Sequence, residues 1–403
     1  MNTATDLNAG DRLARRNALL LATATALAGA NATVIFATAA IVGAALASDP
    51  SYATIPISFF VVGMALGTLP IGYIARRYGR RTAFVTGTSA GVLTGILASV
   101  AVVYGLFSLL CLATFFGGVY GATAQSYRFA AADSASDAFR PKAIAWVLAG
   151  GIFAAVIGPQ LVTHTMNMWQ PYLFAASYLF QAGIAALSMI VLLFVKAPPP
   201  LAANTPDARP LSEIVRAPRF IAAVICGIVS YGLMNFMMTS APLAMKLCGH
   251  DVTESNLAIE FHVMAMYAPS FITGSLIARF GAPKIIALGM LLIIAAAAVG
   301  LAGITVPHFW ANMILLGFGW NFGFIGATAL VTETHLPSER TKVQSFNDFL
   351  VFGTMVIGSF SSGRILVDYG WSMVNIVVFP LVLAGFGALM LFGRKREAAV
   401  ALG

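Results

Sequence analysis

A chain of 403 residues would ordinarily hold two or three soluble domains, but the composition excludes that interpretation. Hydrophobic residues make up 59% of the chain and charged residues only 9%, whereas about 25% of the residues in a soluble domain are charged. So few charges cannot cover a water-exposed surface, and the sequence therefore predicts a membrane protein. The formal net charge of +8 would also suit a nucleic-acid-binding protein, so the positions of the basic residues have to decide between the two.

Long segments with at most one charged residue, taken in chain order, predict membrane-spanning helices, because a helix needs about 20 apolar residues to cross a bilayer. Their hydrophobic residues do not alternate with polar ones, as the strands of a membrane β-barrel would. We therefore expect an all-α membrane protein with twelve transmembrane helices. The segments are 17–48 (one helix), 50–75 (one), 82–127 (two), 143–195 (two), 220–245 (one), 255–278 (one), 285–332 (two), 343–363 (one) and 369–393 (one).

The basic residues indicate the orientation of these helices. If both termini lie on one side of the membrane, that side receives all of the 23 basic residues except Lys246 and Arg364. Cytoplasmic loops carry the excess of Lys and Arg, so we expect a multi-pass protein of the bacterial inner membrane with both termini in the cytoplasm. The positive charge then reflects topology and does not support a nucleic-acid partner. The first apolar segment continues to Leu46, which is too long for a cleaved signal peptide.

One long hydrophilic segment divides the helices into two groups of six. This proline-rich segment, residues 196–219, separates an expected N-terminal six-helix bundle (1–195) from an expected C-terminal one (220–403). An internal repeat at one constant separation supports the division and predicts two pseudo-symmetric bundles. The repeated residues are Gly72, Arg77 and Gly79 in the first half and Gly274, Arg279 and Gly281 in the second.

The segment from Gly72 to Arg81 is similar to the signature G-x-L-x-D-R-x-G-R-R/K of the major facilitator superfamily, and the chain resembles that family over essentially its whole length. The resemblance implies a transporter whose two halves rock about a central site. Arg76 replaces the family's acidic residue, which helps to latch the outward-facing state, so an Arg76 latch would need Asp133 or Asp137. The residues with an implied gating role are Gly72, Arg76, Arg77, Gly79, Arg80, Arg128, Asp133 and Asp137. Arg128, at the cytoplasmic end of the fourth span, could contact Asp133 or Asp137; the alternative is a basic residue that only extends to the membrane surface.

Ionisable side chains inside the spans are costly and are therefore candidate functional groups. Glu260 lies about 9 Å deeper along its helix than Glu254, and its carboxyl could shuttle a proton, assisted by His262 on another face of the helix. The alternative is a carboxylate exposed in an outer vestibule or paired with Lys246. Asp348 is a further proton-coupling candidate, for which the alternative is an acid stabilised at a helix N-terminus by the helix dipole.

Polar and aromatic side chains near the span centres are candidates for binding the substrate. No Lys or Arg lies in the middle of helices one or seven, which disfavours a strongly anionic substrate, and the first six spans contain no acid that would recognise a cation. The pattern favours a neutral, partly aromatic small molecule, although aromatic side chains in helices are more often packing residues. The candidates are Asn31, Tyr231, Asn235, Tyr267, Trp320 and Asn321.

Three functions compete: a proton-coupled importer of a neutral metabolite or vitamin, a proton-driven exporter of drugs or metabolites, and an intramembrane enzyme or sensor. The sequence has no HExxH motif or paired intramembrane aspartates, which disfavours an enzyme. It has no nucleotide-binding P-loop, so ATP is not the expected direct energy source. We expect no cofactor or metal, and a monomer. Segments 127–133 and 345–349 are similar to a bacterial branch of the superfamily that includes riboflavin importers, which makes riboflavin uptake the specific expectation and efflux the alternative.

Overall fold

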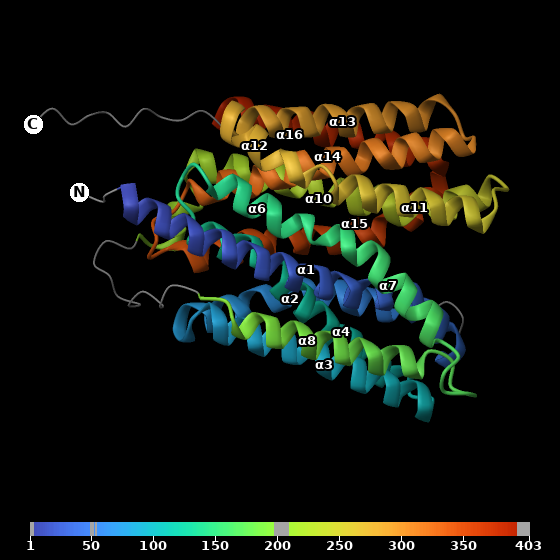
Figure 1. Ribbon diagram of the computed structural model, residues 1–403. Helices are drawn as coiled ribbons and strands as arrows, with labels where there is room; N and C mark the ends of the chain where they lie inside the picture. Colours follow the sequence, from blue (N-terminus) through green and yellow to red (C-terminus); the bar gives the residue numbers. More distant parts are fainter. Residues whose placement is uncertain (1–3, 49–51, 53–54, 197–208, 393–403) are drawn as a thin grey trace, which may run out of the picture.

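The computed structural model describes residues 4–48, 52, 55–196 and 209–392, and their regular secondary structure is helical. The helices form two bundles, the first (blue to green) below the second (yellow to red) in Figure 1. The first bundle contains α1 (Ala4–Leu46), α2 (Ile55–Tyr78), α3 (Arg80–Tyr104), α4 (Phe107–Gln125), α5 (Tyr127–Asp133), α6 (Arg140–Ala149), α7 (Gly151–Thr165) and α8 (Ala175–Leu193).

The short helix α9 (Leu211–Ile214) precedes the second bundle. We call the end of the molecule where α1 begins the linker end, and the opposite end the far end; the linker end is on the left in Figure 1. The second bundle contains α10 (Pro218–Leu247), α11 (Val252–Tyr267), α12 (Ser270–Phe280), α13 (Ala282–Ala302), α14 (Val306–Thr332), α15 (Arg340–Ile376) and α16 (Val378–Phe392).

The number of membrane-capable helices differs slightly from the expected twelve. In the described residues, ten helices are long and apolar enough to cross a membrane, and the pair α11–α12, bent by 40°, raises the number to eleven. The expected span 343–363 lies in α15, whose early turns carry the polar residues Gln344, Asn347 and Asp348. These residues lower its hydropathy without preventing a helix. A break at Gly370, with φ of 81°, then interrupts α15.

The internal repeat of the sequence is also a repeat of backbone conformation. Gly79 joins α2 to α3 with φ 90° and ψ 160°, and Gly281 joins α12 to α13 with φ 86° and ψ 149°. Side chains other than glycine rarely adopt this region. The two equivalent glycines therefore make the same tight turn in each bundle.

The two bundles pack together through one equivalent glycine from each. A Cβ atom added at Gly72 on α2 would lie 1.9 Å from the Ser345 Oγ on α15. A Cβ atom added at Gly274 on α12 would lie 2.6 Å from the Lys142 Cα on α6. The contacts α2–α15 and α6–α12 are thus related by the pseudo-symmetry, and glycine permits the close approach in both.

The segment before α9 is held against the second bundle by a buried carboxylate. Glu339, at the start of α15, accepts hydrogen bonds from the Arg209 backbone N (2.8 Å), Nε (2.9 Å) and Nη2 (2.8 Å), and from the Leu336 backbone N at 2.8 Å. Burial raises the pKa of the Glu339 carboxyl, but these hydrogen bonds outweigh that effect and lower the pKa to about 2. The carboxylate is therefore charged throughout the physiological pH range.

We expect Glu339→Gln to release this attachment and to speed protease cleavage of the linker about tenfold, since it removes the charge that strengthens the hydrogen bonds to Arg209. A carboxyl with a lowered pKa stabilises the fold above its ordinary pKa of 4.5 and loses that contribution as the pH falls toward 2. Cleavage of the unaltered linker by an acid-tolerant protease should therefore stay slow down to about pH 4. Glu213→Gln, at an exposed position of α9, is the matched control. Equal cleavage of both variants would contradict this prediction.

Candidate functional site

A buried ion pair joins the two bundles. Arg128 on α5 is 0% exposed, and its Nη2 lies 2.6 Å from the Asp348 Oδ1 on α15. Its Nε donates a hydrogen bond to the Thr328 Oγ1 on α14 at 3.2 Å. Its Nη1 donates to the backbone oxygen and to the Oε1 of Gln125. One guanidinium of the first bundle thus holds two helices of the second.

This pair differs from the contacts expected from sequence. Arg128 was expected near Asp133 or Asp137, and the alternative for Asp348 was an acid stabilised by the helix dipole alone. In the structure Arg128 and Asp348 form an ion pair with each other, and the Asp348 side chain is 4% exposed. Removing one partner of a buried ion pair leaves an uncompensated charge and costs about 3–5 kcal/mol. The bundles therefore cannot part here unless water enters or the charge changes.

Aromatic residues named from the sequence meet beside the ion pair. The Trp320 ring lies 5.6 Å from the rings of Tyr231 and Tyr267, edge to face in both cases. Phe324 stacks on Trp320 at 5.3 Å, and the Arg128 guanidinium lies over the Phe324 ring at 4.6 Å. We call Tyr231, Tyr267, Trp320 and Phe324 the aromatic cluster. It is contiguous with the Arg128–Asp348 pair.

Two buried N–H donors near the aromatic cluster have no hydrogen-bond partner in the described part of the chain. They are Trp320 Nε1 and Asn235 Nδ2. Asn235 lies one turn after Tyr231 on α10, so the two side chains share a helix face. Across the bundle interface, Gln125 Nε2 donates to the Tyr231 hydroxyl at 3.3 Å. Buried donors in native proteins normally find a partner, so a ligand or water is the expected acceptor.

The two other asparagines proposed as substrate ligands are engaged in hydrogen bonds within their own bundles. Asn31 on α1 exchanges hydrogen bonds with Gln181 on α8 at 3.2 and 2.7 Å. The Asn321 Nδ2 donates to the Met266 backbone oxygen (2.6 Å) and the Ser270 Oγ (2.7 Å), and its Oδ1 accepts from Thr273 at 2.6 Å. The three hydrogen bonds of Asn321 tie α14 to the bend between α11 and α12.

The proton-coupling candidates on α11 lie in different environments. Glu260 is exposed, whereas His262 is 0% exposed. The His262 Nδ1 is 2.8 Å from the Met313 backbone oxygen on α14, which favours the tautomer that carries a proton on Nδ1, while Nε2 has no partner among the described residues. The two side chains thus point to different faces of α11, as their spacing predicts.

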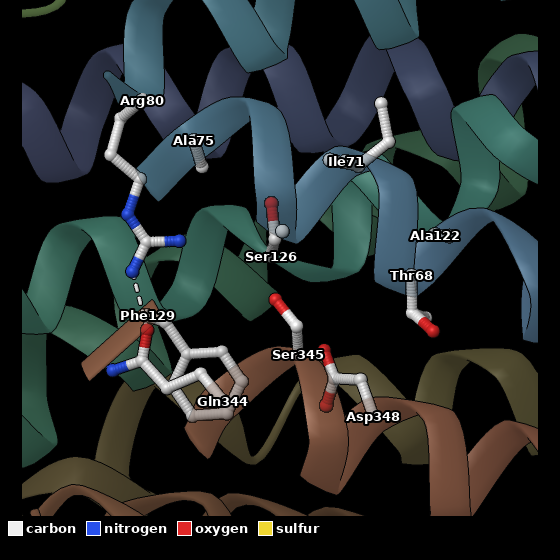
Figure 2. A pocket seen from close by; sticks show the side chains of 11 residues that line it. Thr68, Ile71, Ala75, Arg80, Ala122, Ser126, Phe129, Gln344, Ser345 and Asp348 are labelled. Carbon is white, nitrogen blue, oxygen red and sulfur yellow. Dashed lines mark hydrogen bonds between the residues drawn. The ribbon is translucent and has the colours of Figure 1, made fainter. Parts of the chain in front are cut away.

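A second polar contact between the bundles lies closer to the linker end. Asp133 Oδ2 is 2.7 Å from Arg80 Nη2 and 3.5 Å from Arg340 Nε. Arg80 also donates to the Gln344 Oε1, and Figure 2 shows its guanidinium pointing across the interface toward that amide. The same view places Ser345 and Asp348 on the helix that carries Gln344. We call Arg80, Asp133, Arg340 and Gln344 the gate cluster.

A small cavity lies between the gate cluster and the buried ion pair. It leaves about 20 Å³ for the centres of water molecules, which is enough for a single ordered water. Arg80, Gln344 and Asp348 line it together with apolar and small side chains (Figure 2). This cavity is therefore far too small for a substrate.

The structure does not place Arg76 beside Asp133 or Asp137, the partners expected for an Arg76 latch. Arg76 is exposed, and its guanidinium lies 5.7 Å from the Tyr73 ring centroid. Arg77 is also exposed, and Asp137 pairs with Arg140 at 2.9 Å. Asp133 binds the side chains of the gate cluster instead, because the turn at Gly79 directs the following residue into the interface.

Gln344 and Thr328 were not among the candidates, although both contact the charged groups of the interface, as Gln125 does. Gln344 precedes Asp348 by one helical turn, and Gln125 precedes Arg128 by three residues, so each pair shares a helix face. That spacing of polar residues within apolar helices was an available signal. The contact of Thr328 with Arg128 crosses from one bundle to the other and left no such local pattern.

The fold and these contacts agree with a comparison to known families. Residues 20–267 match the sequence model of the Major Facilitator Superfamily, and the chain belongs to this superfamily. It is 45% identical to the riboflavin transporter RfnT of Brucella anthropi over 391 residues, which cover 96% of this chain and 98% of that protein. It is also 30% identical to YddS, an uncharacterized MFS-type transporter of Bacillus subtilis, over 89% of this chain and 87% of that one.

Solved structures of other transporters share the two-bundle fold. The outward conformation of the MFS transporter FucP has a TM-score of 0.75 at 14% identity, covering 94% of this chain and 99% of FucP. The human organic anion transporter MFSD10 has a TM-score of 0.74 at 14% identity, with 93% and 99% covered. The protein is therefore a multi-pass membrane transporter, as the sequence predicts.

Proposed function

We propose that this protein takes up riboflavin across the bacterial inner membrane by proton-coupled alternating access, as a monomer with both termini in the cytoplasm. The observation that carries the proposal is the aromatic cluster, with its two buried donors that lack a partner among the described residues, directly beside a buried ion pair that joins the bundles. The 45% identity to a riboflavin transporter over nearly the whole chain supports the choice of substrate.

The aromatic cluster matches the chemistry of a flavin. A flavin has a flat, neutral ring with polar edges and a polyol tail. Stacking on Trp320 or Tyr231 would contribute about 0.5–1.5 kcal/mol beyond the burial of area. Trp320 Nε1 and Asn235 Nδ2 can donate to the acceptors on the ring edge, and each donor left without an acceptor would cost about 1–3 kcal/mol.

Asp348 is the group that we propose carries the coupling proton. In the closed interface its carboxylate neutralises Arg128. A proton on Asp348 would remove that attraction. The bundles could then part at the linker end, and water could enter and hydrate the Arg128 guanidinium. Glu260 is a weaker candidate for this role, because it is exposed and its carboxylate forms no ion pair with the described residues of the other bundle.

The alternation would use the two contacts related by pseudo-symmetry. The described interface is closed at the linker end by the gate cluster and by the close approaches at Gly72 and Gly274. We propose that substrate enters from the far end, and that protonation of Asp348 then releases the linker end toward the cytoplasm. The direction of transport follows from which side supplies the proton and the flavin.

The substrate is tested in a riboflavin auxotroph that lacks its own uptake system. Expression of this chain should restore growth at low external riboflavin. Trp320→Ala should reduce labelled riboflavin uptake at least about tenfold, whereas Trp320→Phe, which keeps a smaller aromatic ring and removes the donor, should reduce it severalfold. Trp169→Phe, at an exposed position, serves as the control. A chain that reaches the membrane without raising growth or uptake above the empty vector would exclude riboflavin import.

A further inference from the structure

An apolar groove lies on the membrane-facing surface of the first bundle. It runs between α1 and the α6–α7 pair, with Phe271 of α12 at its border, and its volume is about 520 Å³. Its floor is made of small residues, because α1 and the junction between α6 and α7 approach so closely that a Cβ atom at Gly150 would lie 2.1 Å from the Ala22 backbone oxygen. Its rim carries Leu19 and Phe153, which are 60% and 59% exposed.

Basic and aromatic side chains precede the groove at the linker end. Arg15 lies one turn before Leu19 on α1, and its guanidinium is 5.5 Å from the Phe139 ring centroid. Phe139 in turn meets Trp146, which lines the groove, edge to face at 5.3 Å. Lys142 lies one turn before Trp146 on α6, so its Cα–Cβ bond points to the same side of the helix. Two cations thus stand where the apolar wall ends.

We propose that this groove binds one anionic phospholipid, with the phosphate between Arg15 and Lys142 and one acyl chain along the apolar wall. The lining offers an acyl chain a cleft that almost no polar group interrupts. Basic residues beside transmembrane helices attract anionic headgroups, and Trp side chains favour the membrane–water interface. Because Phe271 belongs to the second bundle, the bound lipid would touch both bundles at the interface that has to move.

Native mass spectrometry of the full-length purified protein tests the site. Phosphatidylglycerol or phosphatidylethanolamine with identical acyl chains is added in equal amounts, and the bound fraction is measured. The wild-type chain should retain one phosphatidylglycerol in preference to phosphatidylethanolamine. Arg15→Gln with Lys142→Gln should lower phosphatidylglycerol retention about tenfold and remove the preference. Thr23→Trp, which fills the groove at an exposed position, should lower retention of both lipids at this site.

The matched control is Arg81→Gln with Lys284→Gln. These two exposed residues also lie at the linker end, and the double variant loses the same charge without touching the groove. It should retain phosphatidylglycerol like the wild-type chain. Equal retention of both lipids by the wild-type chain, or an equal loss in the control, would show general annular binding and overturn the proposal. Unchanged retention in Thr23→Trp would place any bound lipid outside the groove.

Discussion

Replacing Asp348 with asparagine is expected to abolish uphill riboflavin accumulation. Asparagine keeps the size of the side chain and its hydrogen bonding, but it holds no titratable proton. In proteoliposomes with an imposed proton gradient, the variant should accumulate no substrate above the external concentration. Exchange of internal for external riboflavin needs no net proton movement and should be partly retained.

The unpaired Arg128 in this variant raises the cost of the closed state by about 3–5 kcal/mol, so folding must be controlled. The double change Asp348→Asn with Arg128→Gln removes both charges and should restore expression. In this double variant the proton gradient should still drive no riboflavin accumulation. Glu260→Gln, by contrast, should accumulate riboflavin like the wild-type chain. Proton-driven accumulation by Asp348→Asn, with its loss in Glu260→Gln, would transfer the coupling role to Glu260.

Adding a single methyl group at Gly72 is expected to reduce transport at least about tenfold, since overpacking costs typically 1–3 kcal/mol. The new Cβ would lie 1.9 Å from the Ser345 Oγ and 2.4 Å from its Cβ. Gly72→Ala should therefore prevent the linker end from closing. Ser345→Gly deletes both atoms and leaves the Ser345 Cα at 3.9 Å, an ordinary contact distance, so the double variant should recover most of the uptake.

Accessibility of a cysteine placed in the gate cluster measures closure directly. Gln344→Cys should react with an added thiol reagent faster in the Gly72→Ala background than in the wild-type background. Gly183→Ala is the matched control, because a Cβ at that position of α8 would lie within 4 Å of no neighbouring helix among the described residues. A Gly72→Ala chain that transports normally, or one that Ser345→Gly does not rescue, would falsify the proposed closing contact.

Much of the fold follows from local patterns of the sequence. Apolar segments of bilayer length predict the helices, and the hydrophilic segment 196–219 divides them. The repeat of Gly79 and Gly281 predicts equivalent turns, because each turn needs a backbone conformation that glycine adopts readily. Spacing also separates Glu260 from His262 on α11. These features depend on residues that are close together in the chain.

The candidate site was predicted less completely. Tyr231, Tyr267 and Trp320 were proposed together because of their chemistry, and the structure places them in contact. Asn321 belonged to the same proposal, yet its amide is hydrogen-bonded to residues at the bend between α11 and α12. Sequence shows that a polar side chain lies inside a span, but hydrogen-bond partners from other helices decide whether it remains open to a substrate.

Charge pairing between the bundles is the feature that sequence could not supply. Arg128 and Asp348 are 220 positions apart, and several acids could have paired with that arginine according to local spacing. The sequence determined the membrane helices, their division into two halves and the chemical types inside them, since these depend on hydropathy and backbone preference. Docking of the two halves selected Asp348 for Arg128 and brought Arg340 to Asp133, because a buried charge is stable only beside the partner that the packed helices bring to it.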